Sequence, residues 1–197
     1  TQATFYLGEA LTSLGQFKDA TEAYQYVVTH AVGTPWADLA YFGLGWSYFQ
    51  QGKCRDALAA FDRSVTVPDQ ATGLEADLAD AVESSLAERL FAQGRCQLEL
   101  GNESAALMSL QALRDQAFDH PLVIDAALAE AELLQARGQL AEAVSLLSMT
   151  MAHPAVDAHH REQLHVHLGG LSQALGDPAR AAAHFLAAAQ ASDPDVR

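Results

Sequence analysis

A pattern of small and large residues recurs five times along this 197-residue chain, and it constrains the fold more than any other feature. Each copy has a central glycine, a glycine or alanine seven residues earlier, an alanine five residues later and a large apolar residue nine residues later. The central glycines are Gly15, Gly52, Gly101, Gly138 and Gly176. The earlier small residues are Gly8, Gly45, Gly94, Ala131 and Gly169. The large residues are Tyr24, Phe61, Leu110, Leu147 and Phe185. Such a repeat predicts an array of similar structural units.

These recurring positions predict a helix, a tight turn and a second helix in each copy of the repeat. A glycine ends the first helix at least cost, because it readily adopts the left-handed backbone of a tight helix end. Small residues let two antiparallel helices approach closely, and the large residue fills the space beside that contact. Asn102, Asp177 and Thr34 stand where helices are expected to begin, and Pro35 and Pro178 follow two of them. Since strand-like alternation is absent, we expect an all-α protein.

Two stretches carry the pattern most fully: LGEALTSLGQFKDATEAY at residues 7–24 and LGWSYFQQGKCRDALAAF at residues 44–61. They resemble the tetratricopeptide repeat family, whose pattern has Leu-Gly, an aromatic residue or leucine, glycine, alanine, and then tyrosine or phenylalanine. The resemblance implies a right-handed α-solenoid of about five antiparallel helix pairs that forms a single domain over residues 1–197. The expected units are residues 1–34, 35–68, 74–121, 122–158 and 159–194.

Two features depart from the regular repeat. Gln93, Gln97 and Glu130 replace apolar residues expected in the third and fourth units, which puts the local packing there in question. The second and third central glycines are 49 residues apart, whereas the other intervals are 37 or 38 residues. The extra residues lie around 67–90, where residues 68–73 have the composition of a loop and the remainder has high helical propensity. We therefore expect the third unit to begin with a lengthened helix.

In the family, the first helices of successive units line a concave surface where partner peptides or helices bind. Carried over by register, this surface draws three residues from each of the first three units. They are Phe5, Tyr6, Glu9, Phe42, Trp46, Phe49, Phe91, Arg95 and Leu98. Its aromatic content favours docking of a peptide or helix through apolar anchors. A clamp for a terminal carboxylate is not expected, because Arg95 is the only base among these residues. The alternative is that neighbouring helices bury the aromatic side chains.

The charge of the chain restricts the class of partner. Its 25 acidic residues outnumber its 11 lysines and arginines, giving a formal net charge of −14. Binding of nucleic acid requires a basic surface, so it is not expected. No apolar run reaches the roughly 20 residues that a membrane-spanning helix needs. The sequence therefore favours a scaffold for a neutral or basic protein or peptide. The alternative role is a structural or assembly module that packs on a longer chain or self-associates, since the helix expected at 179–191 is apolar on several sides.

No motif points to catalysis, a cofactor or a metal ion. The glycines of residues 43–45 lack the third glycine and the preceding strand of a phosphate-binding loop. The histidines of residues 159–167 lack the spacing that places two metal ligands on one turn of a helix. Cys54 and Cys96 could form one bridge, but the sequence favours two separate buried thiols. The lengthened units are similar to those of bacterial envelope-associated repeat proteins, while a cytoplasmic location stays open.

Overall fold

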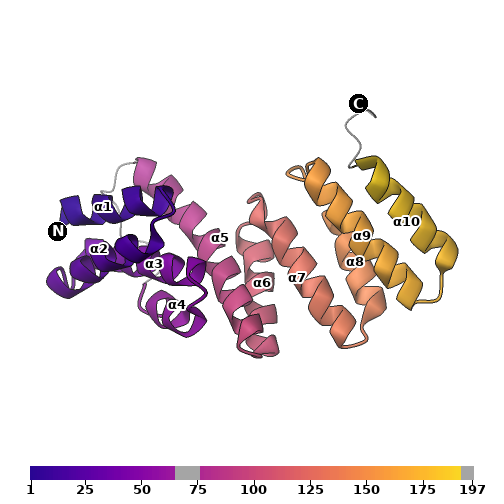
Figure 1. Ribbon diagram of the computed structural model, residues 1–197, viewed down its shortest axis with the longest axis horizontal. Coiled ribbons are helices and arrows are strands. Elements are labelled where there is room, and N and C mark those ends of the chain that lie inside the picture. Colours follow the sequence, from indigo (N-terminus) through magenta and orange to yellow (C-terminus); the bar gives the residue numbers. More distant parts are fainter. Residues whose placement is uncertain (65–75, 192–197) are drawn as a thin grey trace. The chain divides into compact units, whose positions relative to one another are not determined.

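A computed structural model describes the backbone of residues 1–64 and 76–191, and the side chains of residues 1–64 and 86–191. Every regular element in these ranges is an α-helix (Figure 1). The helices are α1 (Gln2–Ser13), α2 (Phe17–His30), α3 (Pro35–Gln50), α4 (Cys54–Phe61), α5 (Ala76–Glu99), α6 (Glu103–Gln116), α7 (Leu122–Ala136), α8 (Leu140–Thr150), α9 (Ala158–Ala174) and α10 (Pro178–Ala191). The all-α fold of successive helix pairs predicted from the sequence is confirmed. None of the described helices is both long and apolar enough to cross a membrane.

The chain divides into two compact units, Thr1–Ser109 and Leu110–Arg197. In the first unit α1 packs on α2, α2 on α3, α3 on α4, and α5 lies against both α3 and α4. In the second unit α7 packs on α8, α8 on α9, and α9 on α10. Helices that are consecutive in the sequence therefore pack against one another in space, as they do in helical repeat proteins. That the repeats act as the one domain predicted over residues 1–197 stays a prediction.

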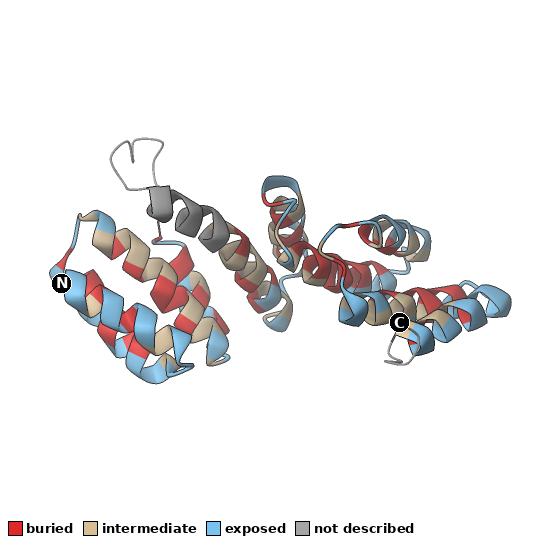
Figure 2. Cartoon of the chain, turned by 90° about the horizontal axis from the view of Figure 1, so that it is seen from above, coloured by how far each residue is buried: buried red, intermediate tan, exposed pale blue. Residues whose placement is uncertain are grey.

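Large side chains fit against glycines of the facing helix in both units. The buried ring of Tyr24 lies against Gly8, and the buried ring of Phe61 lies against Gly45. A Cβ atom placed on Gly45 would come within 2.6 Å of the Phe61 ring. Figure 2 shows that the buried residues lie along the facing sides of the helices. The small residue and the large residue of a repeat thus pack against each other, as expected from the sequence.

The turns between paired helices have the predicted conformation. All five central glycines have positive φ angles, between 70° and 77°. After α1, the amide of Gly15 donates to the carbonyl of Thr12, and the amide of Gln16 donates to the carbonyl of Leu11. This pair of bonds is the Schellman arrangement, which satisfies carbonyls that the helix end leaves free. Among the predicted helix starts, Asp177 accepts a hydrogen bond from the amide of Arg180.

Two of the three polar residues that replace apolar ones in the middle repeats, Gln97 and Glu130, have polar partners. The side chain of Gln97 accepts a hydrogen bond of 2.8 Å from Ser109. Glu130 is only 4% exposed and forms an ion pair of 3.0 Å with Arg114, while Gln111 donates to the same carboxylate. Buried charged groups need such partners. At Gln97 and Glu130, the packing that the sequence left in question is therefore completed by hydrogen bonds and an ion pair.

The lengthened helix expected in the third unit is α5, which has 24 residues. The loop predicted at residues 68–73 lies outside the described residues. The sequence-based preference for two separate thiols is wrong, because Cys54 at the start of α4 and Cys96 near the end of α5 form a disulfide. Both cysteines are buried, as predicted, but their Cα atoms are 4.9 Å apart, within the range that a disulfide spans. Spacing along the chain could not show that α5 folds back onto α4.

Candidate functional site

The nine residues predicted to line a binding surface come from α1, α3 and α5, which all belong to the first unit. Helix α3 contacts both α1 and α5. Each of the three helices is the first member of a helix pair, and in each the predicted residues recur at helical spacing. The first unit therefore brings these residues onto neighbouring helices, and their exposure differs widely.

At the α1 end, aromatic rings form a connected cluster. Phe5 is buried and packs edge-on against Tyr24, with its ring centre also 5.4 Å from that of Trp36. Tyr6 remains 55% exposed and packs edge-on against Trp36 at 5.9 Å. Phe5 is thus mainly a core residue, whereas Tyr6 offers an accessible aromatic face beside Trp36.

Trp36 was not predicted to line the surface, because the repeat register took only Phe42, Trp46 and Phe49 from α3. Trp36 lies in the first turn of α3 and packs, half-buried, on the core formed by α1, α2 and α3. The spacing of apolar residues could have indicated this position. Leu39 and Ala40, three and four residues after Trp36, share its helix face and pack on the same core.

Glu9 is held by an internal hydrogen bond. The hydroxyl of Tyr24 donates to the Glu9 carboxylate, and the same hydroxyl lies 3.3 Å from the hydroxyl of Thr12. Burial of the phenol and this bond to a carboxylate both raise the pKa of Tyr24 far above its usual value. Glu9 is therefore an exposed carboxylate whose orientation is fixed by the Tyr24 hydroxyl, which donates to one of its two oxygens.

A second carboxylate on α5, Glu88, lies near Glu9. Partial burial raises the pKa of Glu88, and the negative charge of Glu9 raises it further. Glu88 was not among the predicted residues, because its position near Glu9 cannot be read from the repeat register. Two carboxylates that repel each other beside exposed aromatic rings form a place where a positive charge is favoured.

The aromatic residues of α3 are neither free nor fully buried. Phe42 packs on Phe61, with ring centres 6.1 Å apart. Trp46 lies 5.4 Å from Phe49, and Phe49 packs edge-on against Phe91 of α5 at 6.5 Å. All three α3 residues pack on the small core that surrounds the disulfide. Helix α5 thus covers part of this stripe, and each ring keeps some exposure.

The α5 residues complete the set. Phe91 and Leu98 are half-buried, and Arg95 is exposed. Together with Tyr6, Trp36, Trp46 and Phe49, they form what we call the aromatic surface of the first unit. Its rings can make apolar contacts, and its nearby carboxylates, Glu9 and Glu88, can attract a cation. No nucleophile paired with a base was found among the described residues of this surface.

The histidines noted in the sequence lie in the second unit and do not gather at one point. His160 contacts Asp157 at 2.9 Å, and His167 lies 3.9 Å from Glu132. His165 packs against His184 of α10, with their Nδ1 atoms 3.1 Å apart. Over the described part of the chain, no three potential metal ligands come together.

Comparison with known proteins supports the helical-repeat fold. The sequence model of the tetratricopeptide repeat family matches residues 39–66, which cover most of α3 and all of α4. The structure of MamA is 17% identical in sequence, with a TM-score of 0.71 over 93% of each chain. The structure of YrrB, a TPR protein with an unusual peptide-binding site, is 16% identical, with a TM-score of 0.67 over 98% of this chain and 87% of that one. Nearly identical TPR-like repeats from Podosopora anserina are 21% identical, with a TM-score of 0.66 over 100% of this chain and 96% of the other.

A comparison with curated proteins gave no match. The chain is a helical repeat protein with the fold of tetratricopeptide repeat structures. Its second helix pair also carries the sequence pattern of that family. The resemblance inferred from residues 7–24 and 44–61 is therefore confirmed.

Proposed function

We propose that the chain is a non-catalytic scaffold that binds a peptide or helical segment of a partner protein on the aromatic surface of the first unit. Helical repeats of this fold present extended surfaces to other proteins. The observation that carries the proposal is the set of partly exposed rings on neighbouring helices, with Tyr6 the most exposed at 55%. Aromatic side chains of this kind are the usual anchors of protein interfaces.

The two carboxylates give the proposed partner its charge. Partial burial raises the pKa of Glu88, and the negative charge of the nearby Glu9 raises it further. A lysine or arginine of the partner would relieve this repulsion on binding. The net charge of −14 acts in the same direction, because it draws basic segments toward the protein. The proposed ligand is thus a segment with large apolar side chains and at least one basic residue.

Peptides selected from a random display library with the full chain as bait supply a probe for this proposal. The protein has two tryptophans, Trp36 and Trp46, and both lie at the aromatic surface, so its intrinsic fluorescence should change on binding. Tyr6→Ala should weaken binding of the selected peptides about tenfold, since it removes an exposed anchor.

Tyr26→Ala is the matched control for Tyr6→Ala. Tyr26 is 48% exposed, lies on α2 and stacks on His30, outside the aromatic surface. It should leave affinity unchanged. Equal affinity of the Tyr6→Ala and unaltered chains, with no change in tryptophan fluorescence, would reject the proposed surface.

The pH dependence of binding gives a second test. Protonation of Glu88 removes one of the charges that attract a basic residue. Because the pKa of Glu88 is raised, affinity for a lysine-bearing peptide should begin to fall at a higher pH than for an ordinary glutamate. Glu88→Gln should lower the affinity at neutral pH and remove this part of the pH profile. A profile that is identical in the Glu88→Gln protein would contradict the role of this carboxylate.

A second role, self-association, is favoured by one observation. Helix α10 exposes Leu186 to 62% and Phe185 to 42%, although it packs on α9. A second copy of the chain could cover this apolar face. Sedimentation velocity over a range of protein concentrations tests this role. Association should weaken in Leu186→Ser, and a chain that stays monomeric at all concentrations would rule the role out.

A further inference from the structure

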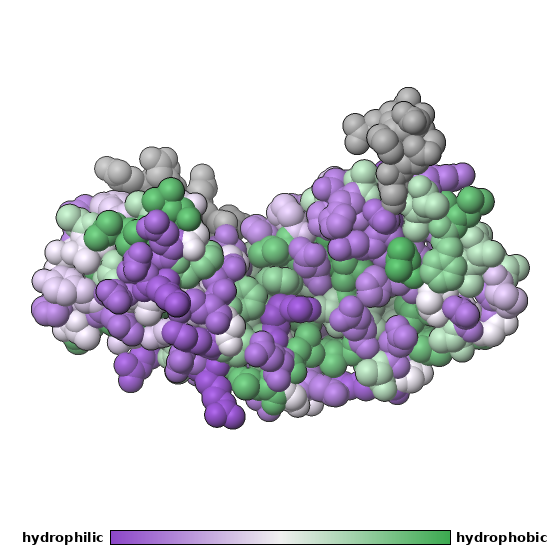
Figure 3. All heavy atoms as spheres, in the orientation of Figure 1, coloured by the Kyte–Doolittle hydropathy of each residue, from purple (hydrophilic) through white to green (hydrophobic). Residues whose placement is uncertain are grey.

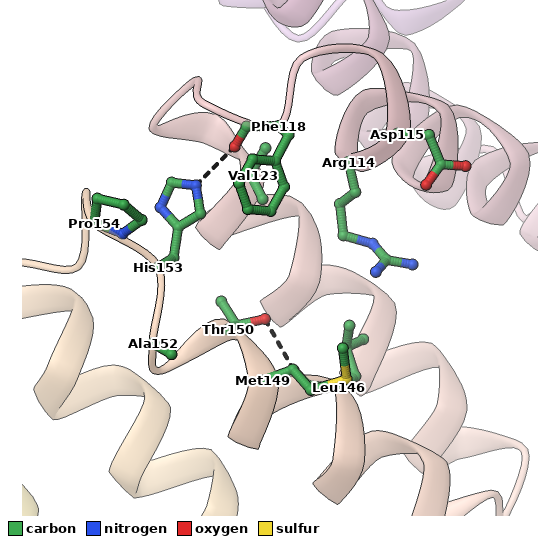
Figure 4. A pocket seen from close by; sticks show the side chains of 10 residues that line it. All are labelled: Arg114, Asp115, Phe118, Val123, Leu146, Met149, Thr150, Ala152, His153 and Pro154. Carbon is green, nitrogen blue, oxygen red and sulfur yellow. Dashed lines mark hydrogen bonds between the residues drawn. The ribbon is translucent and has the colours of Figure 1, made fainter.

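The second unit contains a cavity of about 370 Å³ that the proposed aromatic surface does not include. It lies between the end of α6, the turn before α7, the end of α8 and the turn before α9, and all its lining residues fall within 114–154 (Figure 4). Sites that hold small ligands or single anchoring side chains usually begin at about 300 Å³. This cavity is therefore large enough to accept a large apolar side chain.

Two polar side chains in the wall of the cavity, Thr150 and His153, already have hydrogen-bond partners, whereas the Nε atom of Arg114 is buried without one among the described residues. Thr150 donates to the carbonyl of Leu146. His153 accepts from the amide of Ala155 through Nδ1, so Nε2 carries the proton and donates to the carbonyl of Phe118 at 2.7 Å. Since Thr150 and His153 are satisfied, a polar ligand would gain little from these two side chains and would lose its bonds to water. The cavity thus favours an apolar occupant.

Two large apolar side chains at the cavity are unusually exposed. Phe118 is 60% exposed and Met149 is 75% exposed (Figure 4). Val123, by contrast, is buried in the wall. Figure 3 shows hydrophobic and hydrophilic residues interspersed on the visible face of the molecule. Exposed apolar residues beside an apolar cavity are typical of an interaction site, because burying them in a complex releases water from their surface.

The charged residues around the cavity determine whether a positively or a negatively charged ligand is favoured. Arg114 lines the cavity, but its charge is neutralised by the buried carboxylate of Glu130 at 3.0 Å. Asp115 also lines the cavity, is exposed, and forms no ion pair within the described residues. The net local charge is therefore negative. A carboxylate ligand would be repelled, whereas a lysine or arginine next to the inserted side chain would be attracted.

We propose that this cavity, which we call the α8 pocket, is a second docking site that binds a large apolar side chain of a peptide segment flanked by basic residues. The site is independent of the aromatic surface, since its residues belong to the second unit. A protein with both sites could bind two segments of one partner, so that the first contact raises the effective concentration of the second.

The three methionines of the chain allow a direct test by NMR of ¹³C-methyl methionine. Met149 lies at the α8 pocket, whereas Met108 is 72% exposed on α6 and lines no part of it. The probe is the synthetic peptide Lys-Lys-Phe-Lys-Lys. We expect a saturable shift of the Met149 signal and an unmoved Met108 signal. A Met149 signal that does not move would overturn the proposal, whatever happens at the aromatic surface.

Two further peptides separate insertion from simple charge attraction. Lys-Lys-Ala-Lys-Lys keeps the charge and lacks the ring, and Glu-Glu-Phe-Glu-Glu keeps the ring and reverses the charge. Each should bind about tenfold more weakly, because each loses one of the two contributions. Equal shifts of Met149 with the phenylalanine and alanine peptides would mean surface attraction only and would reject the pocket.

Variants at exposed positions complete the test without disturbing the core. Phe118→Ala keeps the carbonyl that His153 bonds and should weaken the peptide about tenfold. Ala152→Phe, at an exposed position in the wall, should fill the α8 pocket and block binding. Met108→Ala should have no effect on affinity measured by fluorescence anisotropy of a labelled peptide. Unchanged affinity in both Phe118→Ala and Ala152→Phe would overturn the proposal. Peptide-induced changes of tryptophan fluorescence report the aromatic surface separately.

Discussion

At the scale of single residues, the fold depends on glycines that let a neighbouring ring approach the helix backbone. Gly45 faces Phe61, which is 1% exposed and has no room to move. Gly43 faces the ring of Tyr24, so this ring is held between α1 and α3. The repeat pattern predicts the first kind of contact, whereas the contact of Gly43 with Tyr24 of the preceding helix pair depends on how the pairs pack in three dimensions.

A pair of glycine substitutions tests this explanation. Gly45→Ala should lower the free energy of unfolding by about 1–3 kcal/mol, because the new methyl group overlaps a ring that cannot move. Gly170→Ala is the matched control: Gly170 is also within a helix, but an added Cβ atom meets no atom within 4 Å. It should raise stability by about 0.5–1 kcal/mol through higher helix propensity. Urea denaturation followed by circular dichroism measures both, and equal effects would contradict the packing argument.

The buried ion pair of the second unit gives another residue-scale prediction. Arg114→Ala leaves the carboxylate of Glu130 buried and without its charged partner, which should cost about 3 kcal/mol of unfolding free energy. Replacing both residues, as in Arg114→Leu with Glu130→Leu, removes the charge problem and should cost much less. Thermal and urea unfolding of the single and double variants give the coupling energy. Additive losses would show that the pair does not act as a unit.

At the scale of elements, α5 is the helix that departs most from a regular repeat. It has 24 residues, contacts both α3 and α4, and supplies Glu88 and Phe91 to the aromatic surface. The disulfide between Cys54 and Cys96 attaches it to α4, and the rings of α3 pack on the same small core. The position of α5 therefore decides how much of the aromatic stripe on α3 remains exposed.

Breaking the disulfide should loosen α5. The bridge closes a loop with a sequence separation of 42 residues, and loss of such a cross-link is expected to lower the unfolding free energy by about 4 kcal/mol. Reduction of the protein should produce this loss and change the fluorescence of Trp46, whose neighbours pack around the bridge. Cys54→Ser with Cys96→Ser should show the same stability with and without reductant. A reductant-independent stability of the unaltered chain would contradict a stabilising bridge.

At the scale of the whole molecule, the negative net charge influences which molecules associate with the protein. A net charge of −14 spread over 197 residues repels other copies of the chain and attracts basic partners. The aromatic surface and the α8 pocket each combine apolar contacts with uncompensated carboxylates, so both should respond to salt in the same direction.

Salt should act on the rate of binding more than on the lifetime of the complex. We expect the association rate constant of a lysine-containing peptide to fall about tenfold or more between low and physiological ionic strength, because screening removes long-range attraction. The dissociation rate should change little, since apolar contacts hold the bound peptide. Stopped-flow fluorescence measures both rates. An association rate independent of salt would show that charge does not steer the partner.

The sequence by itself determined the helix pairs, the turn glycines, the contacts of Gly8 with Tyr24 and Gly45 with Phe61, and the lengthened first helix of the third repeat, α5. Each follows from local propensity or from a fixed spacing within one repeat, so the order of residues carries it. Tertiary structure alone decided the disulfide between α4 and α5, the proximity of Glu88 to Glu9, the place of Trp36 and the α8 pocket. These features join residues of different repeats, and spacing along the chain does not encode how far one helix pair rotates against the next.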